Sequence, residues 1–183
     1  MYDADRRDGV NRGLVGCGVI VAIAVALVAT WAGSYSRLVK LHEAVDSAWD
    51  EVDGAYQRRA DLVSTLMGTA RGAEQTERDA WAQLVEAHAA VERIDFGSAP
   101  DSEQLAQFEA AQSRLSSALS RVVAAAGPYP GLEAAENEIV LAQERFNDAT
   151  LLYNKTRRRF PTILLAKVAG FGSRPYLDAK PTL

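Results

Sequence analysis

The stretch from residue 13 to residue 36 carries no charged side chain, and it constrains this chain more than any other feature. It reads GLVGCGVIVAIAVALVATWAGSYS and lies between two arginines. A helix needs about 20 apolar residues to cross a bilayer, whereas the apolar part of a secretory signal is shorter. Trp31 and Tyr35 lie near its C-terminal end, where amphipathic rings favour the headgroup zone. We therefore predict a single transmembrane helix over residues 13–36, which places the protein at the cell membrane.

Two forms of processing are alternatives to an uncut helix. Residues 14–17 resemble a lipoprotein cleavage box with Cys17 as the lipid carrier, but here the apolar run follows the cysteine instead of preceding it. Cleavage within the Ala-rich residues 22–32 is the second alternative. An uncut anchor fits the order of the regions best.

The orientation of the anchor depends on the cations that flank it. Arg6, Arg7 and Arg12 precede the span together with the amino terminus, and Arg37 and Lys40 follow it. Because the cytoplasmic side carries more such cations, the balance favours a soluble domain on the extracytoplasmic side.

Composition indicates one folded domain after the anchor. Apolar residues make up 48% of the chain and charged residues 24%, which suits a packed domain and not a disordered tail. The single cysteine excludes an intramolecular disulfide and the usual zinc patterns. His42 and His88 lack a ligand-type spacing to carboxylates, so we expect both on helix surfaces and expect neither a metal nor a cofactor.

Charge is divided unevenly along the sequence. Seven cations follow Asn154 against the single Asp178, so in a chain of net charge -4 the preceding residues carry -10. An acidic body without a basic, aromatic-rich face argues against nucleic-acid binding. A basic tail suits anionic lipid or an acidic partner surface.

Apolar periodicity predicts helices throughout the rest of the chain. The first helix runs to about residue 72 with a seam at alternating steps of three and four. Its seam residues are Leu38, Leu41, Val45, Ala48, Val52, Ala55, Leu62, Leu66 and Ala70. Nothing separates it from the anchor, so both can form one continuous helix. Gly54 interrupts it, and we interpret this glycine as a close approach of a neighbouring helix.

Three more helices are predicted over residues 76–94, 101–126 and 132–160. One side of the second carries Trp81, Leu84, Val85, His88 and Val91, and the apolar stripe of the third consists of Leu105, Phe108, Ala111, Leu115, Leu119 and Val122. The fourth carries Leu132, Ala135, Ile139, Ala142, Phe146, Ala149, Leu152 and Tyr153. Asp101 or Ser102 caps the third helix, and Gly127-Pro128 ends it.

These helices and their short connections predict an all-α fold, in which a transmembrane helix precedes an antiparallel, up-down four-helix bundle with long helices. The predicted divisions are a polar segment (1–12), the transmembrane helix (13–36), the bundle (37–160) and a basic, apolar tail (161–183).

Several polar and aromatic motifs follow one another along the chain: Val45-Asp46-Ser47-Ala48-Trp49-Asp50-Glu51-Val52, Arg58-Arg59-Ala60-Asp61-Leu62-Val63, Tyr129-Pro130-Gly131-Leu132, Phe146-Asn147-Asp148-Ala149, Tyr153-Asn154 and Phe160-Pro161. In this order they resemble the LemA family of bacterial membrane-anchored helical proteins. The family usually has Pro-Asn where this chain has Ser64-Thr65, so a local kink is expected to be missing. The resemblance implies a membrane-tethered helical bundle, and the family as a whole has no agreed enzymatic activity.

Arg58, Arg59 and Asp61 are the most motif-like polar residues, and they fall within one helical turn. We favour a structural role over a binding role, with Asp61 paired to a base on the next helix and the arginines extended over the apolar seam. Asn147 and Asn154 share a helix face, and we expect hydrogen bonds from them across the bundle.

The anchor carries small residues every four positions, at Gly18, Ala22, Ala26, Thr30 and Ser34. Such a stripe allows another helix to approach closely, so we hypothesise a homo-oligomer formed through the transmembrane helix. An accidental stripe in an Ala-rich span is the alternative.

The tail after Phe160 is basic and carries Ile163, Leu164, Leu165, Val168 and Phe171. Helix lengths bring it back near the bilayer, where it either lies on the membrane surface or covers the open end of the bundle.

No catalytic set of residues can be assembled from the sequence, so we expect a non-enzymatic scaffold or assembly factor at the membrane. An accessory or regulatory subunit of a membrane enzyme or transporter is the alternative. The expected partners are membrane lipid, a second copy of the chain and an unidentified membrane protein.

Overall fold

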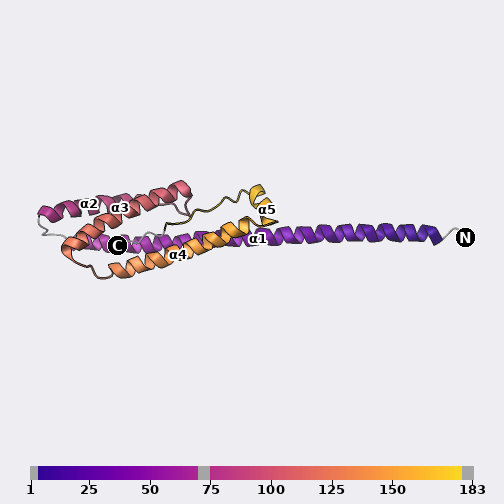
Figure 1. Cartoon of the computed structure of the whole chain (residues 1–183), viewed down its shortest axis with the longest axis horizontal. Coiled ribbons are helices and arrows are strands. Elements are labelled where there is room, and N and C mark those ends of the chain that lie inside the picture. The colour runs from indigo at the N-terminus through magenta and orange to yellow at the C-terminus, as the bar shows by residue number, and fades with distance from the viewer. Residues whose placement is uncertain (1–3, 70–74, 179–183) are drawn as a thin grey trace. The chain divides into compact units, whose positions relative to one another are not determined.

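The computed structural model describes the backbone of residues 4–69 and 75–178, and the side chains of residues 22, 25, 26, 28–68 and 78–178. Over these residues the chain forms five α-helices and no strand (Figure 1). The helices are α1 (Ala4–Thr69), α2 (Gln75–Val91), α3 (Ser102–Ala126), α4 (Leu132–Arg157) and α5 (Thr162–Val168). The predicted all-helical class is confirmed, and α5 is an additional helix within the predicted tail. As expected, α1 continues from the uncharged stretch into the first bundle helix without a break.

The chain divides into two compact units. Unit 1 contains Met1–Lys40 and Thr156–Gly172, and unit 2 contains Leu41–Lys155 and Ser173–Leu183. Unit 2 holds the helical bundle, whereas unit 1 holds the N-terminal part of α1 together with α5.

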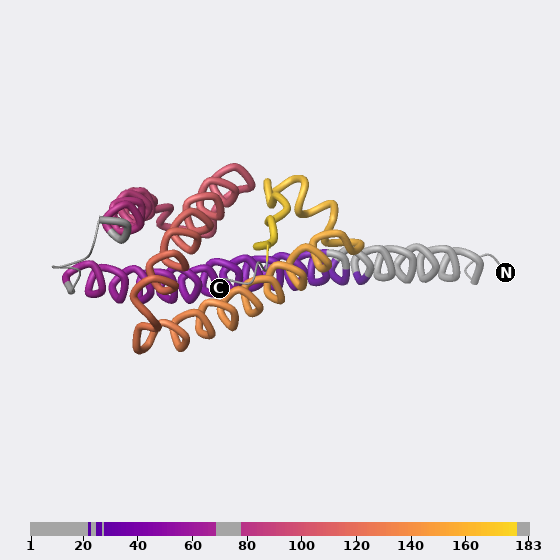
Figure 2. Tube along the Cα trace, turned by 60° about the vertical axis from the view of Figure 1, so that its left-hand side comes forward, coloured from indigo at the N-terminus to yellow at the C-terminus, as the bar shows by residue number. Residues whose placement is uncertain are grey.

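Ion pairs fix the directions of the helices in unit 2. Glu51 of α1 pairs with Arg145 of α4, and Arg58 of α1 pairs with Glu138 of α4. From the first pair to the second, the residue number rises by seven on α1 and falls by seven on α4. The two helices are therefore antiparallel. The α2 and α3 helices pack against each other, as the tube in Figure 2 also shows.

Most of the predicted apolar stripes form the core of unit 2. One cluster unites Val63, Leu66, Leu84, Ala87, Leu115, Ala118, Leu119, Val122 and Leu132. A second group is aromatic, in which the Trp49 ring lies 5.2 Å from that of Phe108 and 5.7 Å from that of Phe146. Two predicted core residues are instead exposed, Val85 at 52% and Leu152 at 48%, because each lies at the edge of its helix stripe.

The ends of α3 follow the predicted signals. Asp101 accepts hydrogen bonds from the backbone N–H groups of Glu103 and Gln104, and the Gln104 side chain accepts from the Asp101 N–H. This reciprocal arrangement is a capping box. Gly127 ends the helix at a φ of 89°, a conformation that favours glycine.

The interpretation of Gly54 is wrong. A Cβ atom built on Gly54 would meet only the Arg58 guanidinium, at 3.6 Å, which is an ordinary contact with a flexible side chain. Within the described part of the chain, no neighbouring helix approaches closely enough to require glycine at this position.

Among the described residues, no helix combines the length and the apolar character needed to cross a membrane. Residues 13–21, 23, 24 and 27 of the predicted span lie outside the residues whose side chains are described.

Candidate functional site

The three motif-like residues of α1 have three different environments. Arg59 is fully buried, whereas Arg58 is exposed and pairs with Glu138 on α4 through a 2.8 Å bond from its Nε. Asp61 is exposed, and the described side chains include no ion partner for it. The predicted pairing of Asp61 is therefore not observed, and the buried arginine contradicts the expectation that both arginines extend over the seam.

Arg59 is the centre of a buried polar cluster between three helices. Its Nη2 donates to Gln112 Oε1, and its Nη1 donates to Ser116 Oγ at 3.0 Å and to Glu136 Oε1 at 3.1 Å. The guanidinium carbon lies 5.0 Å from the centre of the Tyr56 ring, a cation–π distance. Opposite charge and hydrogen bonds thus offset the burial of the Glu136 carboxylate and of the two terminal guanidinium nitrogens, whereas Arg59 Nε is buried without a hydrogen-bond partner among the described residues.

Sequence spacing contains a signal for this cluster. The alternating steps of three and four run from Ala55 to Leu62, and the position skipped between them is Arg59. Gln112 and Glu136 likewise occupy steps of four from the buried Phe108 and Leu132. Polar residues at core positions of three helices indicate a buried polar layer.

Tyr56 extends the cluster toward α4. Gln143 donates from Nε2 to the Tyr56 hydroxyl oxygen at 2.7 Å. Burial raises the pKa of the Tyr56 hydroxyl, with the nearby Arg59 opposing the rise. One turn earlier, burial together with the carboxylates of Asp95 and Asp50 raises the pKa of Asp53.

A second polar site fastens the C-terminal residues of unit 2 to α4, and we call it the tail clasp (Asn147, Asn154, Arg174 and Leu177). Asn147 exchanges two 2.9 Å hydrogen bonds with the backbone N–H and carbonyl of Leu177. Asn154 does the same with the backbone of Arg174, at 2.8 and 3.1 Å. The two asparagines do share a face, as predicted, but they bind the tail and not another helix.

The Arg174 side chain continues this attachment. It donates to the carbonyl oxygen of Ala99 at 2.8 Å and to Asp46 Oδ1 at 3.0 Å. His42 lies beside the same guanidinium, with Nε2 3.3 Å from Nη2. Leu177 is buried, so the clasp holds the C-terminal segment through one charged side chain, Arg174, and one apolar side chain, Leu177. The clasp is thus a structural lock within unit 2.

The expectation that both histidines lie on helix surfaces is wrong for His88. Its ring is buried, and Nε2 lies 3.0 Å from the carbonyl oxygen of Ala60 on α1. The apolar stripe of α2 carries His88 inward because it follows Leu84 by one turn.

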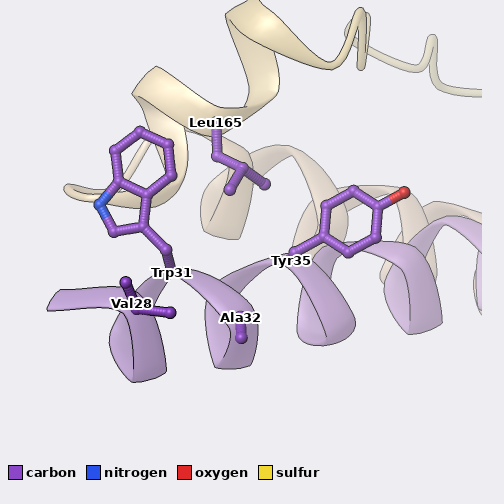
Figure 3. Close-up of a pocket in the computed structure, with 5 residues that line it drawn as sticks. All are labelled: Val28, Trp31, Ala32, Tyr35 and Leu165. Atoms are coloured by element: carbon purple, nitrogen blue, oxygen red, sulfur yellow. The ribbon is translucent and has the colours of Figure 1, made fainter. Parts of the chain in front are cut away.

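Unit 1 presents an apolar groove, which we call the Trp31 groove. Val28, Trp31, Ala32 and Tyr35 of α1 line it, and Leu165 of α5 projects into it (Figure 3). Its volume is about 510 Å³. The apolar residues of the tail differ in exposure. Leu165 and Ala166 are buried, whereas Ile163, Leu164 and Val168 are exposed.

The candidate stripe of the anchor is only partly described. Ala22 and Ala26 are exposed on α1, whereas Gly18 lies outside the residues whose exposure is described. Among the side chains described, no three ligand residues gather in a way that would hold a metal ion.

The sequence model of the LemA family matches residues 48–182, which cover most of the bundle and the tail. No curated protein matches the chain.

Proposed function

The chain belongs to the LemA family, and on that premise we propose that it is a single-pass membrane protein whose helical domain serves as a scaffold or assembly factor and not as an enzyme. Residues 13–36 are the anchor in this proposal. The bundle lies outside the bilayer, on the extracytoplasmic side.

The exposed apolar side chains at the C-terminal end of the uncharged stretch carry this proposal. Val25, Val28, Trp31 and Tyr35 are exposed at 63%, 69%, 41% and 48%. Single exposed apolar residues are normal, but four within three turns of one helix form a surface that water does not favour. Lipid supplies the apolar surroundings that these side chains lack, and the two aromatic rings suit the headgroup zone.

The buried polar groups of the bundle support a scaffold over an enzyme. Arg59 binds Glu136 and Gln112 through its two terminal nitrogens in a cluster closed to solvent, and Arg59 Nε is buried there without a hydrogen-bond partner among the described residues. Asn147 and Asn154 are occupied by the tail. A catalytic site instead needs titratable groups that converge on a space open to substrate.

Self-association through the anchor would make the protein an assembly unit. Ala22 and Ala26 are small and exposed, so a second helix can approach this face closely. The stripe Gly18, Ala22 and Ala26 is the contact surface in this proposal.

Photo-crosslinking in native membranes tests the scaffold. A photoreactive residue replaces Ala26, and the matched control replaces Leu141, which is 53% exposed on α4. We expect self-adducts from position 26 that decrease in the Gly18→Leu and Ala22→Leu variants. Adducts dominated by one foreign membrane protein would instead support the accessory-subunit alternative, and the absence of self-adducts would refute assembly through the anchor.

A further inference from the structure

The two faces of α5 and the turn before it differ sharply in exposure. Thr162, Leu165 and Ala166 are buried within unit 1. On the outer side, Phe160 is 82% exposed and Val168 is 85% exposed. Ile163 and Leu164 extend the same outer surface, at 38% and 47%. We call these four residues, Phe160, Ile163, Leu164 and Val168, the α5 apolar face.

The inner side of α5 faces the part of α1 around Trp31 and Tyr35. Leu165 closes one wall of the Trp31 groove, opposite Trp31 and Tyr35 (Figure 3). The chain after α5 is also held, because the Tyr35 and Phe171 rings meet edge to face at 6.2 Å. Arg157 donates from Nη1 to the Phe171 carbonyl oxygen at 3.2 Å. The outward direction of the α5 apolar face therefore follows from packing within unit 1.

All charged side chains described in unit 1 are positive. Residues 22–40 and 156–172 contain six cations and no Asp or Glu, although the whole chain has a net charge of -4. The cations are Arg37, Lys40, Arg157, Arg158, Arg159 and Lys167. Three of them, Arg158, Arg159 and Lys167, are exposed and flank the α5 apolar face in sequence.

We propose that the α5 apolar face is a second membrane contact, which inserts among the acyl chains of an anionic phospholipid leaflet while Arg158, Arg159 and Lys167 bind its headgroups. This inference rests on the proposed membrane anchor, since unit 1 contains both. Exposed apolar residues beside cations are the composition of segments that lie in the membrane interface. The Trp31 groove, on the inner side of α5, offers an apolar space for an acyl chain. A uniformly basic surface complements anionic lipid better than neutral lipid.

Spin-label depth measurements on the full chain test the proposal. Single cysteines are placed at Val168, Val25 and Val85 in a Cys17→Ser background, and each protein is reconstituted into vesicles that contain phosphatidylglycerol. Val25 reports the anchor, and Val85, 52% exposed on α2, reports the bundle. Accessibility to oxygen is compared with accessibility to a water-soluble nickel chelate.

We expect labels at Val25 and Val168 to be several-fold more accessible to oxygen than the label at Val85. A lipid-exposed Val25 with a water-exposed Val168 would overturn the α5 contact and leave the anchor intact. A water-exposed Val25 would overturn the anchor itself.

The role of charge has its own test. In the Arg158→Gln, Arg159→Gln, Lys167→Gln variant, or in vesicles of phosphatidylcholine alone, we expect the Val168 label to shift toward water while the Val25 label stays in lipid. An unchanged Val168 label in both cases would refute recognition of anionic headgroups. An Arg37→Gln variant, which removes one cation from α1, serves as a control outside α5.

Discussion

Asn154 and Arg174 face each other as a backbone pair would: the Asn154 amide donates to the Arg174 carbonyl at 2.8 Å and accepts from the Arg174 N–H at 3.1 Å. Asn147 repeats this geometry with Leu177, two turns earlier on α4. Two side-chain amides thus supply hydrogen bonds that an extended segment would otherwise obtain from a neighbouring strand.

Replacing Asn154 with alanine should release the tail. Two hydrogen bonds are lost at a largely buried position, so we expect a loss of about 1–3 kcal/mol in the free energy of unfolding. Hydrogen exchange should show faster exchange at the Arg174 amide. The control is Asn137→Ala, which removes an exposed asparagine from the same helix and should leave that amide protected. Unchanged protection in Asn154→Ala would contradict the clasp.

Adjacent arginines should respond very differently to substitution. Arg59→Met leaves the Glu136 carboxylate buried without its partner, so we expect a loss of about 3–5 kcal/mol. Arg58→Met removes only an exposed pair with Glu138 and should cost about 1 kcal/mol or less. Urea unfolding followed by circular dichroism measures both.

A double variant checks the physical reason. Arg59→Met combined with Glu136→Leu removes both buried charges, so it should recover much of the stability that Arg59→Met loses. Equal losses for Arg58→Met and Arg59→Met would contradict the buried cluster.

Apolar spacing was enough to predict the helical class and most of the core. The stripe of α3 from Leu105 to Val122 is buried as expected, because steps of three and four keep residues on one helix face. Spacing fails where a polar residue takes a core position. Arg59 and His88 were assigned to the surface by residue type, although partners on other helices make their burial favourable.

The tail clasp could not be predicted in the same way. That Asn147 and Asn154 share a face follows from helix geometry. Their partners lie in an extended segment without periodicity, and the pairing depends on how the chain returns after α5. Local sequence contains no such information about a long-range contact.

Gly54→Ala should stabilise the protein. Gly54 lies within α1, and an added Cβ meets only a flexible arginine at 3.6 Å. Alanine is about 1 kcal/mol more favourable than glycine inside a helix. We expect an increase of about that size in the free energy of unfolding. A decrease would show that a neighbouring helix does approach this position.

Asp53→Asn should stabilise the protein near neutral pH but not in acid. The folded state raises the pKa of Asp53 above its ordinary value of 3.8, through burial and then Asp95 and Asp50. The folded protein therefore holds this proton more tightly than the unfolded chain, and ionised Asp53 costs stability as the pH rises above 3.8. Asparagine does not ionise and still accepts the hydrogen bond from Gln57.

Unfolding curves of both proteins at pH 7 and at pH 3 measure this difference. The Asp53→Asn variant should be the more stable at pH 7 and equal to the original chain at pH 3. Asp61→Asn is the control, because Asp61 is exposed. A stability gain of the same size at both pH values would rule out ionisation as the cause.

The membrane anchor is the central claim, and alkaline extraction of native membranes followed by intact-mass measurement tests it most directly. An uncut anchor predicts that the chain stays in the membrane pellet and that its mass includes residues 13–36. A chain recovered in the aqueous fraction, with a mass that begins after Trp31, would contradict the account.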